Sequence, residues 1–223
     1  MKLLALETSS LACSVALEHD GGIVERHALA ERQHTRLVVP MIGEVLDAAG
    51  LAPADLDAVV LGNGPGSFIG LRIAASVAQG LCYGAGLPLV PVSSLAAVAA
   101  EVFRTRPVER VLVAQDAHME EVYLAAFRRG ADDLPVAEGE AVLHPPGRIA
   151  RLQDAESWHA AGAGWQRYPA LLAANEARLA GVLDVAWPRA RDLLALGRRA
   201  WQAGEAIDPQ ALVPAYVRDR VTA

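Results

Sequence analysis

The chain has 223 residues, of which 53% are hydrophobic and 21% charged, so it can bury a substantial core and is too apolar for a disordered protein. Its formal net charge of −6 argues against a protein whose main affinity is for nucleic-acid phosphates. The N-terminus lacks the pattern of a signal peptide, and no uninterrupted apolar stretch reaches the length of a membrane span. Cys13 and Cys82 stand in apolar surroundings, which favours buried free thiols over a disulfide framework. We therefore expect a cytoplasmic protein.

The first half of the chain predicts a three-stranded antiparallel meander, after which helices and strands alternate. The hairpin turn at 19–22 joins the second and third strands. The elements expected in order are strands at 3–6, 13–17 and 23–28, a helix at 33–49, a strand at 58–61, a helix at 68–83, a strand at 89–92 and a helix from Ser93 to Phe103.

A second β-unit begins near Arg110, so we expect an N-terminal lobe at 1–107 and a smaller C-terminal lobe at 108–223. The later elements expected are strands at 111–114, 121–127, 140–143, 158–161, 182–185 and 212–217, and a helix at 188–203. The fold class is α/β.

The stretch from Leu61 to Arg72 is a glycine-rich connection between a strand and a helix. Such a loop offers backbone N–H groups to an anion, and Ser67 is placed to cap the helix. The spacing fits neither a P-loop nor a dinucleotide fingerprint. Two interpretations stay open: a tight connection without a ligand, and an anion or nucleotide loop formed by Gly64, Gly66, Ser67, Gly70 and Arg72.

Two polar clusters are weaker candidates. Glu7 precedes three hydroxyl residues at the first bend, which suits a metal–phosphate, although local turn chemistry explains the same residues. His118 lies close in sequence to Asp116, Glu120 and Glu121, where a polar turn between two strands is the alternative. No two histidines stand three or four residues apart, so the sequence predicts neither a helical metal pair nor a catalytic constellation.

The helices at 33–49 and 68–83 are apolar on nearly all sides. A helix of this kind is buried on both sides, either in the domain interior or by a partner subunit on its outer side. We expect a partner, and an arginine in place of Ala74 is expected to split a dimer. The interface residues predicted are Leu37, Met41, Val45, Ile73, Ala74, Val77 and Leu81.

Several stretches together resemble the bacterial TsaB (YeaZ) family over the whole chain. The block from Gly62 to Ile73 is the most specific. The others are Leu4–Leu17, Gln33–Thr35 with Pro40–Met41, Gln79–Leu81, Val92–Leu95, Asp116–Tyr123 and Val213–Arg218.

The resemblance implies an actin/Hsp70/sugar-kinase-like fold of two related lobes, the second reduced. It implies a non-catalytic scaffold in the synthesis of threonylcarbamoyl-adenosine, beside the anticodon of tRNAs. The partners implied are the catalytic paralogue TsaD, the ATPase TsaE and a second copy of the chain, with tRNA bound only through the complex. No cofactor is expected on this chain alone, since ATP or ADP would bind at the complex. An ATP-binding or glycoprotease-like enzyme is the alternative.

The sequence also departs from the family. Ile69 stands where threonine is usual and Glu7 where aspartate is usual. The paralogue's metal-binding H-x-x-x-H corresponds here to Ser94 and Val98, which are poor metal ligands.

Overall fold

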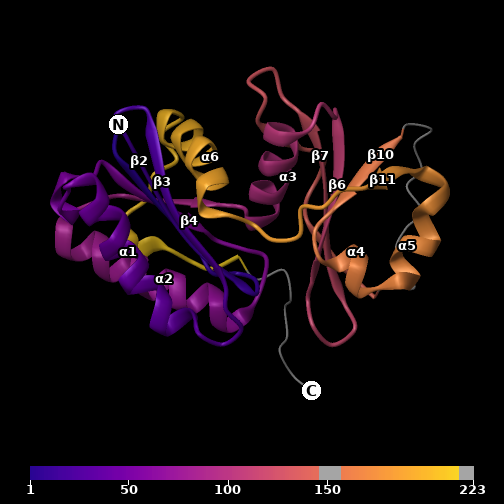
Figure 1. The fold of residues 1–223 in the computed structure, drawn as a ribbon, viewed down its shortest axis with the longest axis horizontal. Helices are drawn as coiled ribbons and strands as arrows, with labels where there is room; N and C mark the ends of the chain where they lie inside the picture. Colours follow the sequence, from indigo (N-terminus) through magenta and orange to yellow (C-terminus); the bar gives the residue numbers. More distant parts are fainter. Residues whose placement is uncertain (146–156, 216–223) are drawn as a thin grey trace. The chain divides into compact units, whose positions relative to one another are not determined.

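The computed structural model describes residues 1–145 and 157–215. They form two compact units, Met1–Ala97 with Pro188–Ala215 and Val98–Trp187. Each unit has one mixed β-sheet with helices packed on it (Figure 1). The α/β class expected from the sequence is confirmed.

The first unit is built on a five-stranded sheet with the order β3-β2-β1-β4-β5. β1 to β3 form the expected antiparallel meander, and β4 and β5 run parallel to β1. The strands are β1 (Leu3–Glu7), β2 (Ala12–His19), β3 (Gly22–Leu29), β4 (Ala58–Gly62) and β5 (Leu89–Val92).

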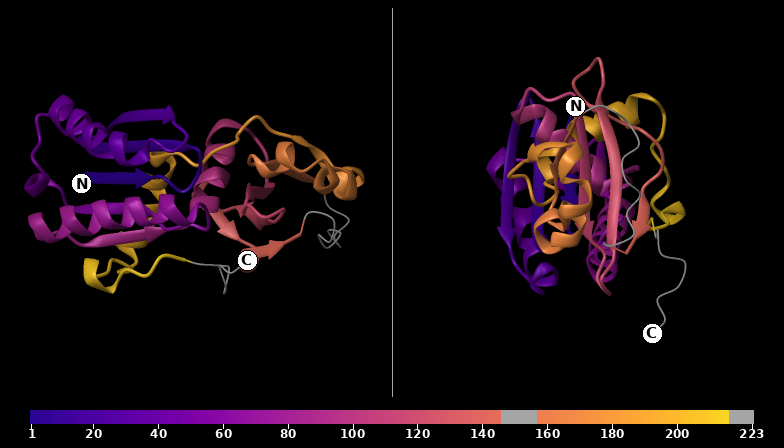
Figure 2. Two further views of the ribbon diagram at one scale, coloured as in Figure 1. Left: turned by 90° about the horizontal axis from the view of Figure 1, so that it is seen from below. Right: turned by 90° about the vertical axis from the view of Figure 1, so that its right-hand side faces the viewer.

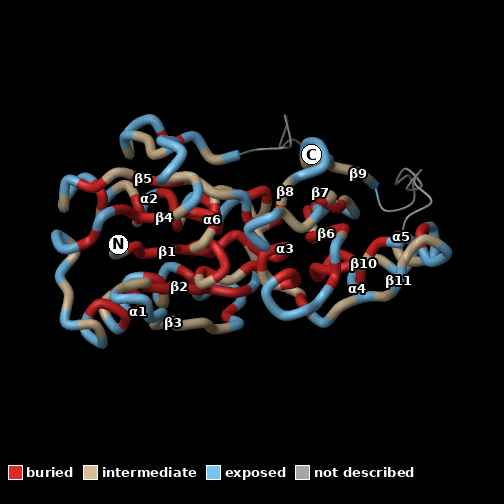
Figure 3. Tube along the Cα trace, turned by 90° about the horizontal axis from the view of Figure 1, so that it is seen from above, coloured by how far each residue is buried: buried red, intermediate tan, exposed pale blue. Residues whose placement is uncertain are grey.

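Helices cover both faces of this sheet, so β1 and β4 are buried on both sides and read as apolar runs. Leu4 and Leu6 pack toward α1 (His34–Ala49) and α2 (Phe68–Ala85). Leu3 and Ala5 point the other way, toward α6 (Ala190–Gln202). Figure 1 shows α6 across the sheet from α1 and α2, and in Figure 3 the central strand β1 is coloured as buried.

α2 is notable for its length and apolarity. Among the described residues it is the one helix, with 18 residues and a mean hydropathy of 1.2, that is long and apolar enough to cross a membrane. Core helices of soluble proteins share these properties, and α2 packs its Ala74 and Ala78 side onto the sheet. We therefore interpret α2 as a helix of the first unit's core layer.

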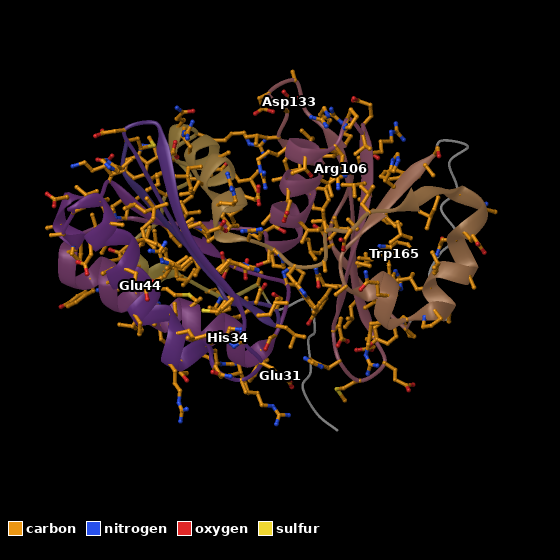
Figure 4. The ribbon with its side chains drawn as sticks, viewed as in Figure 1. Glu31, His34, Glu44, Arg106, Asp133 and Trp165 are labelled. Carbon is orange, nitrogen blue, oxygen red and sulfur yellow. The ribbon has the colours of Figure 1, made fainter. Side chains whose placement is uncertain are left out.

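The second unit has a six-stranded sheet. Five of its strands follow the order β11-β10-β6-β7-β8, and the sixth, β9, also pairs with β7. Trp165 is buried against it and donates from Nε1 to the carbonyl of Leu112 at 3.1 Å (Figure 4). The elements are α3 (Ser94–Thr105), which begins in the first unit, β6 (Arg110–Asp116), β7 (Val122–Arg129), β8 (Pro135–Ala137), β9 (Val142–His144), β10 (Trp158–Ala161), α4 (Gly164–Arg167), α5 (Pro169–Asn175) and β11 (Leu179–Val182).

The units differ from the predicted lobes 1–107 and 108–223, because the first segment of the first unit ends at Ala97 and residues 188–215 belong with that unit. Charge pairing and packing explain why this C-terminal segment, which contains α6, lies on the sheet of the first unit. Arg189 donates through Nε and Nη2 to Glu25 on β3, and Arg198 pairs with Glu18 on β2. Gly197 lies so close to Val60 that a Cβ there would overlap the valine side chain. α6 is thereby held on the first sheet.

Two predicted strands also need correction. The strand expected at 182–185 is β11, which begins and ends three residues earlier, at Leu179–Val182. Residues 212–215 form no strand, because their backbone hydrogen bonds go to the short 3-10 helix η4 (Pro209–Ala211) and to Asn63 instead of to a neighbouring strand; residues 216–217 lie outside the described residues.

Candidate functional site

The glycine loop joins β4 to α2 at the carboxyl end of the parallel strands, where α/β proteins commonly bind ligands. Ser67 caps α2 as predicted, its Oγ accepting from Gly70 N–H at 3.2 Å. The Ser67 N–H itself donates to the Ser9 carbonyl at 2.7 Å. Two of the N–H groups that would cradle an anion are thus bound within the chain.

The glycines of this loop make room for the turn after β1. A Cβ added to Gly70 would overlap the carbonyl oxygen of Thr8, and one added to Gly66 would overlap the backbone of Ser9. The Thr8 hydroxyl closes the contact by donating to the Gly70 carbonyl at 2.7 Å. The close approach that glycine permits is therefore made by the chain's own backbone.

Arg72 is the exposed member of the predicted anion loop. Its guanidinium stacks on the Phe68 ring, 3.2 Å from the ring centroid, and its Nη1 lies 3.4 Å from the Phe68 carbonyl. This contact explains why a cation is tolerated in the first turns of α2, where it opposes the helix dipole. The anion loop remains a prediction, and the geometry favours the alternative of a packed strand-to-helix connection.

Glu7 is fully buried at the end of β1, and both of its carboxylate oxygens have partners. Oε1 accepts from Ser9 N–H at 2.6 Å, and Oε2 accepts from the Ser94 hydroxyl at 2.7 Å. Ser94 Oγ in turn accepts from Gly64 N–H at 3.2 Å. Glu7 thus links β1, the glycine loop and the start of α3.

This arrangement does not fit a metal–phosphate held by Glu7. A cation would have to displace the two donors, Ser9 N–H and the Ser94 hydroxyl. There is also little room, because Gly62 lies so close that a Cβ on it would overlap Glu7 Oε2. The Ser94 hydroxyl donates to Glu7, and Val98 is an apolar side chain that is fully buried. Within residues 1–145 and 157–215, no group of three His, Cys, Asp or Glu side chains is placed to hold a metal.

Burial raises the pKa of Glu7 above 4.5, against the opposing effect of its hydrogen bonds from Ser9 and Ser94. A carboxyl with a raised folded-state pKa destabilises the fold as pH rises from about 4.5 through that pKa. Glu7→Gln cannot ionise, so its stability relative to the natural chain should increase with pH across this window. Urea unfolding between pH 4.5 and 8 measures the difference. Glu31→Gln, at a side chain 70% exposed, is the matched control and should give a flat difference; a flat difference for Glu7→Gln would contradict the account.

The second unit repeats this pattern at the end of β6. Asp116 Oδ1 accepts from His118 N–H at 2.9 Å and from the Tyr168 hydroxyl at 2.6 Å. Burial raises the pKa of Tyr168 to about 12, and the hydrogen bond to Asp116 and the charge of that carboxylate act in the same direction. The phenol is therefore a hydrogen-bond donor at neutral pH. His118, Met119 and Glu120 form a turn in the left-handed region, with φ of 59°, 53° and 56°. The predicted acidic–imidazole cluster is therefore a polar turn, in which the His118 side chain is 72% exposed and its Nδ1 lies 3.7 Å from Asp116 Oδ2.

The structure divides the predicted partner interface into two groups. Met41, Val45 and Ala74 are buried in the first unit's own core, so they are corrected from interface to core residues. Their positions follow the helix stripe that faces the sheet. Leu37, Ile73, Val77 and Leu81 are half-buried at its border and still flank the outer surface.

Exposed apolar and small residues continue this surface along α2. Ile69 is 69% exposed and Tyr83 is 78% exposed, with Ser76 and Gly80 between them. Val39 on α1, 57% exposed, lies on the same layer of helices. We call this surface the outer face of α2, defined as Ile69, Ile73, Ser76, Val77, Gly80 and Tyr83.

Sequence reasoning did not find the contacts of Asn63 and Gln79, which both reach the C-terminal segment of the first unit. Asn63 Nδ2 donates to the Val213 carbonyl at 3.0 Å, and Gln79 Nε2 donates to the Pro209 carbonyl at 2.9 Å. A polar side chain in a helix as apolar as α2 was the signal available for Gln79.

The sheet order, with an antiparallel meander extended by parallel strands and helices on both faces, defines an α/β protein of the actin/Hsp70/sugar-kinase-like class. A family model described as TsaD, tRNA N6-adenosine threonylcarbamoyltransferase, matches residues 6–220. The chain is 38% identical to the tRNA threonylcarbamoyladenosine biosynthesis protein TsaB of Escherichia coli, over 99% of this chain and 96% of that protein. It is 37% identical to the protein of the same name from Haemophilus influenzae, over 100% of this chain and 95% of that one.

A solved structure of YeaZ from Pseudomonas aeruginosa superposes with a TM-score of 0.89 and 37% identity, covering 96% of this chain and 99% of that one. The chain therefore belongs to the TsaB (YeaZ) family, as its motifs indicated.

Proposed function

We propose that this chain is a non-catalytic subunit for the synthesis of threonylcarbamoyl-adenosine in tRNA, which binds a TsaD-type transferase through the outer face of α2. The support from similarity is the name of its relatives and the match to the TsaD model over nearly the whole chain. The role proposed is to activate the transferase and to recruit the TsaE ATPase, in the cytoplasm, with tRNA bound only by the assembly.

The observation that carries this proposal is the contrast between two parts of the first unit. The strand-end carboxylate that would take part in chemistry, Glu7, is buried and fully hydrogen-bonded. The outer face of α2, in contrast, exposes Ile69 and Tyr83 to solvent. Contiguous exposed apolar surface is a common feature of protein interfaces, and this supports the choice of the outer face of α2 as the partner surface.

The same face is open to a second copy of the chain. Its small residues, Ser76 and Gly80, allow a helix to approach closely, and no atom lies within 4 Å of a Cβ added to Gly80. A homodimer and a heterodimer with the transferase would then exclude one another. Neither requires a nucleotide or a metal on this chain.

Reconstitution tests the proposal. The transferase paralogue, the TsaE ATPase, threonylcarbamoyl-adenylate, ATP and tRNA are incubated with and without this chain, and modified adenosine is measured. We expect the rate to fall by at least about tenfold without the chain, equivalent to about 1.4 kcal/mol of activation. An equal rate in both reactions would remove the scaffold role. ATP or peptide hydrolysis by the chain alone would instead favour the enzyme alternative.

A further inference from the structure

The segment that follows α6, residues 204–215, runs back along the first unit and ends at the glycine loop. In Figure 2 it is the yellow segment beside α2. We call it the strap. Its closing residues belong to a motif that the family resemblance singled out and that the proposed function does not use.

The strap first covers the edge of the sheet. Ile207 forms an antiparallel bridge with Leu89 on β5, with Leu89 N–H donating to Ile207 at 3.0 Å and Ile207 N–H donating back at 2.8 Å. β5 is the edge strand, so this pairing satisfies backbone groups that would otherwise face solvent.

The strap then contacts α2 itself. Asp208 caps η4 by accepting from Gln210 N–H at 2.8 Å, and this turn presents the Pro209 carbonyl to Gln79 on α2. Leu212 follows, and it is buried in the same apolar cluster as the inner side of α2.

The end of the strap is hydrogen-bonded to the glycine loop that precedes α2. Asn63 donates from Nδ2 to the Val213 carbonyl at 3.0 Å, and its own carbonyl accepts from Ala215 N–H at 3.2 Å. The side chain of Val213 is 73% exposed, so the strap binds here through its backbone.

We propose that the strap is a conformational clamp: its docking fixes the position of α2, and its release weakens binding at the outer face of α2. The contacts reach the loop that leads into α2, through Asn63, and α2 itself near its middle, through Gln79. The side of α2 that faces a partner is left open. This inference rests on the proposed function, because it describes how partner binding at the outer face of α2 would be regulated.

The test uses two substitutions that lie off the outer face. Asn63→Ala removes the side-chain bond to Val213, and Asp208→Ala removes the cap of η4. Each is expected to favour strap release about fivefold, the effect of one hydrogen bond, and together about 25-fold. Val213→Ser is the matched control within the strap, because that side chain is exposed.

Two measurements separate the outcomes. Hydrogen exchange should speed up at least about tenfold at Ile207 and Ala215 in the double variant, and also in the first turns of α2. The dissociation constant for a second copy or for the transferase, from sedimentation, should rise about threefold to tenfold. Faster exchange in the strap with unchanged α2 amides and unchanged affinity would overturn the clamp. If the natural chain bound neither partner, the proposed function would fail, and the α2 exchange rates would still test whether the strap positions α2.

Discussion

Replacing Gly70 by alanine is expected to lower the free energy of unfolding by about 3 kcal/mol, the range of an overpacked core. The added Cβ would overlap the Thr8 carbonyl oxygen, which is backbone and cannot move away by changing a rotamer. Relief would require the turn after β1 to separate from α2, and that would break the bond from the Thr8 hydroxyl to the Gly70 carbonyl.

Gly80→Ala in the same helix is the matched control. Nothing lies within 4 Å of a Cβ at Gly80, and alanine is the better helix former. We therefore expect Gly80→Ala to raise the free energy of unfolding by about 0.5–1 kcal/mol. Urea unfolding of both variants measures the two effects. Similar values for the two would show that the turn after β1 is not held as tightly as the contacts of Gly70 indicate.

These glycines show why the site could be predicted only in part. A glycine cluster between a strand and a helix indicates that something approaches the backbone closely. It does not say whether the neighbour is a ligand or another segment of the chain. The partner here, the turn at Thr8 and Ser9, lies about 60 residues away in sequence, and the antiparallel and parallel pairing of β1 brings it there.

The fold followed the sequence wherever periodicity was strong. The opening meander, α1, α2 and β10 lie within about two residues of their predicted positions. α4 and α5 were missed, because helices of four and seven residues hold too few turns to show a period. The packing of α6 on the first sheet also involves ion pairs of Arg189 and Arg198 with Glu25 and Glu18, and such long-range pairs have no local signal in the sequence.

The interface prediction shows a similar limit. The apolar composition of a helix indicates that much of its surface is buried. It does not tell which residues pack in the core of the same chain and which are left for a partner. Ala74 was chosen from the sequence as the site for a dimer-splitting arginine, and it is fully buried against the sheet. Ala74→Arg would therefore place a charge in the core and unfold the unit, so loss of a dimer in that variant would not report on the interface.

Ser76→Arg is the variant that the structure selects in its place. Ser76 is exposed on the outer face of α2, between the levels of Ile69 and Tyr83. An arginine there can extend into solvent in the free chain, so the free energy of unfolding should change by less than about 0.5 kcal/mol. In a complex, the charge would be buried without a partner at the centre of the interface. That should raise the dissociation constant about 100-fold, equivalent to about 2.7 kcal/mol.

Two controls make this expectation specific. Ser76→Ala keeps the residue small and should bind within about twofold of the natural chain, because it adds neither bulk nor charge. Ala173→Arg adds the same side chain at an exposed position of α5 in the second unit and should also leave binding unchanged. Sedimentation of each variant with itself and with the transferase gives the affinities, and reconstituted tRNA modification should fall with Ser76→Arg alone. If Ser76→Arg binds as tightly as the natural chain while both arginine variants remain folded, partners do not bind at the outer face of α2. Their contact would then have to lie on another surface of the chain.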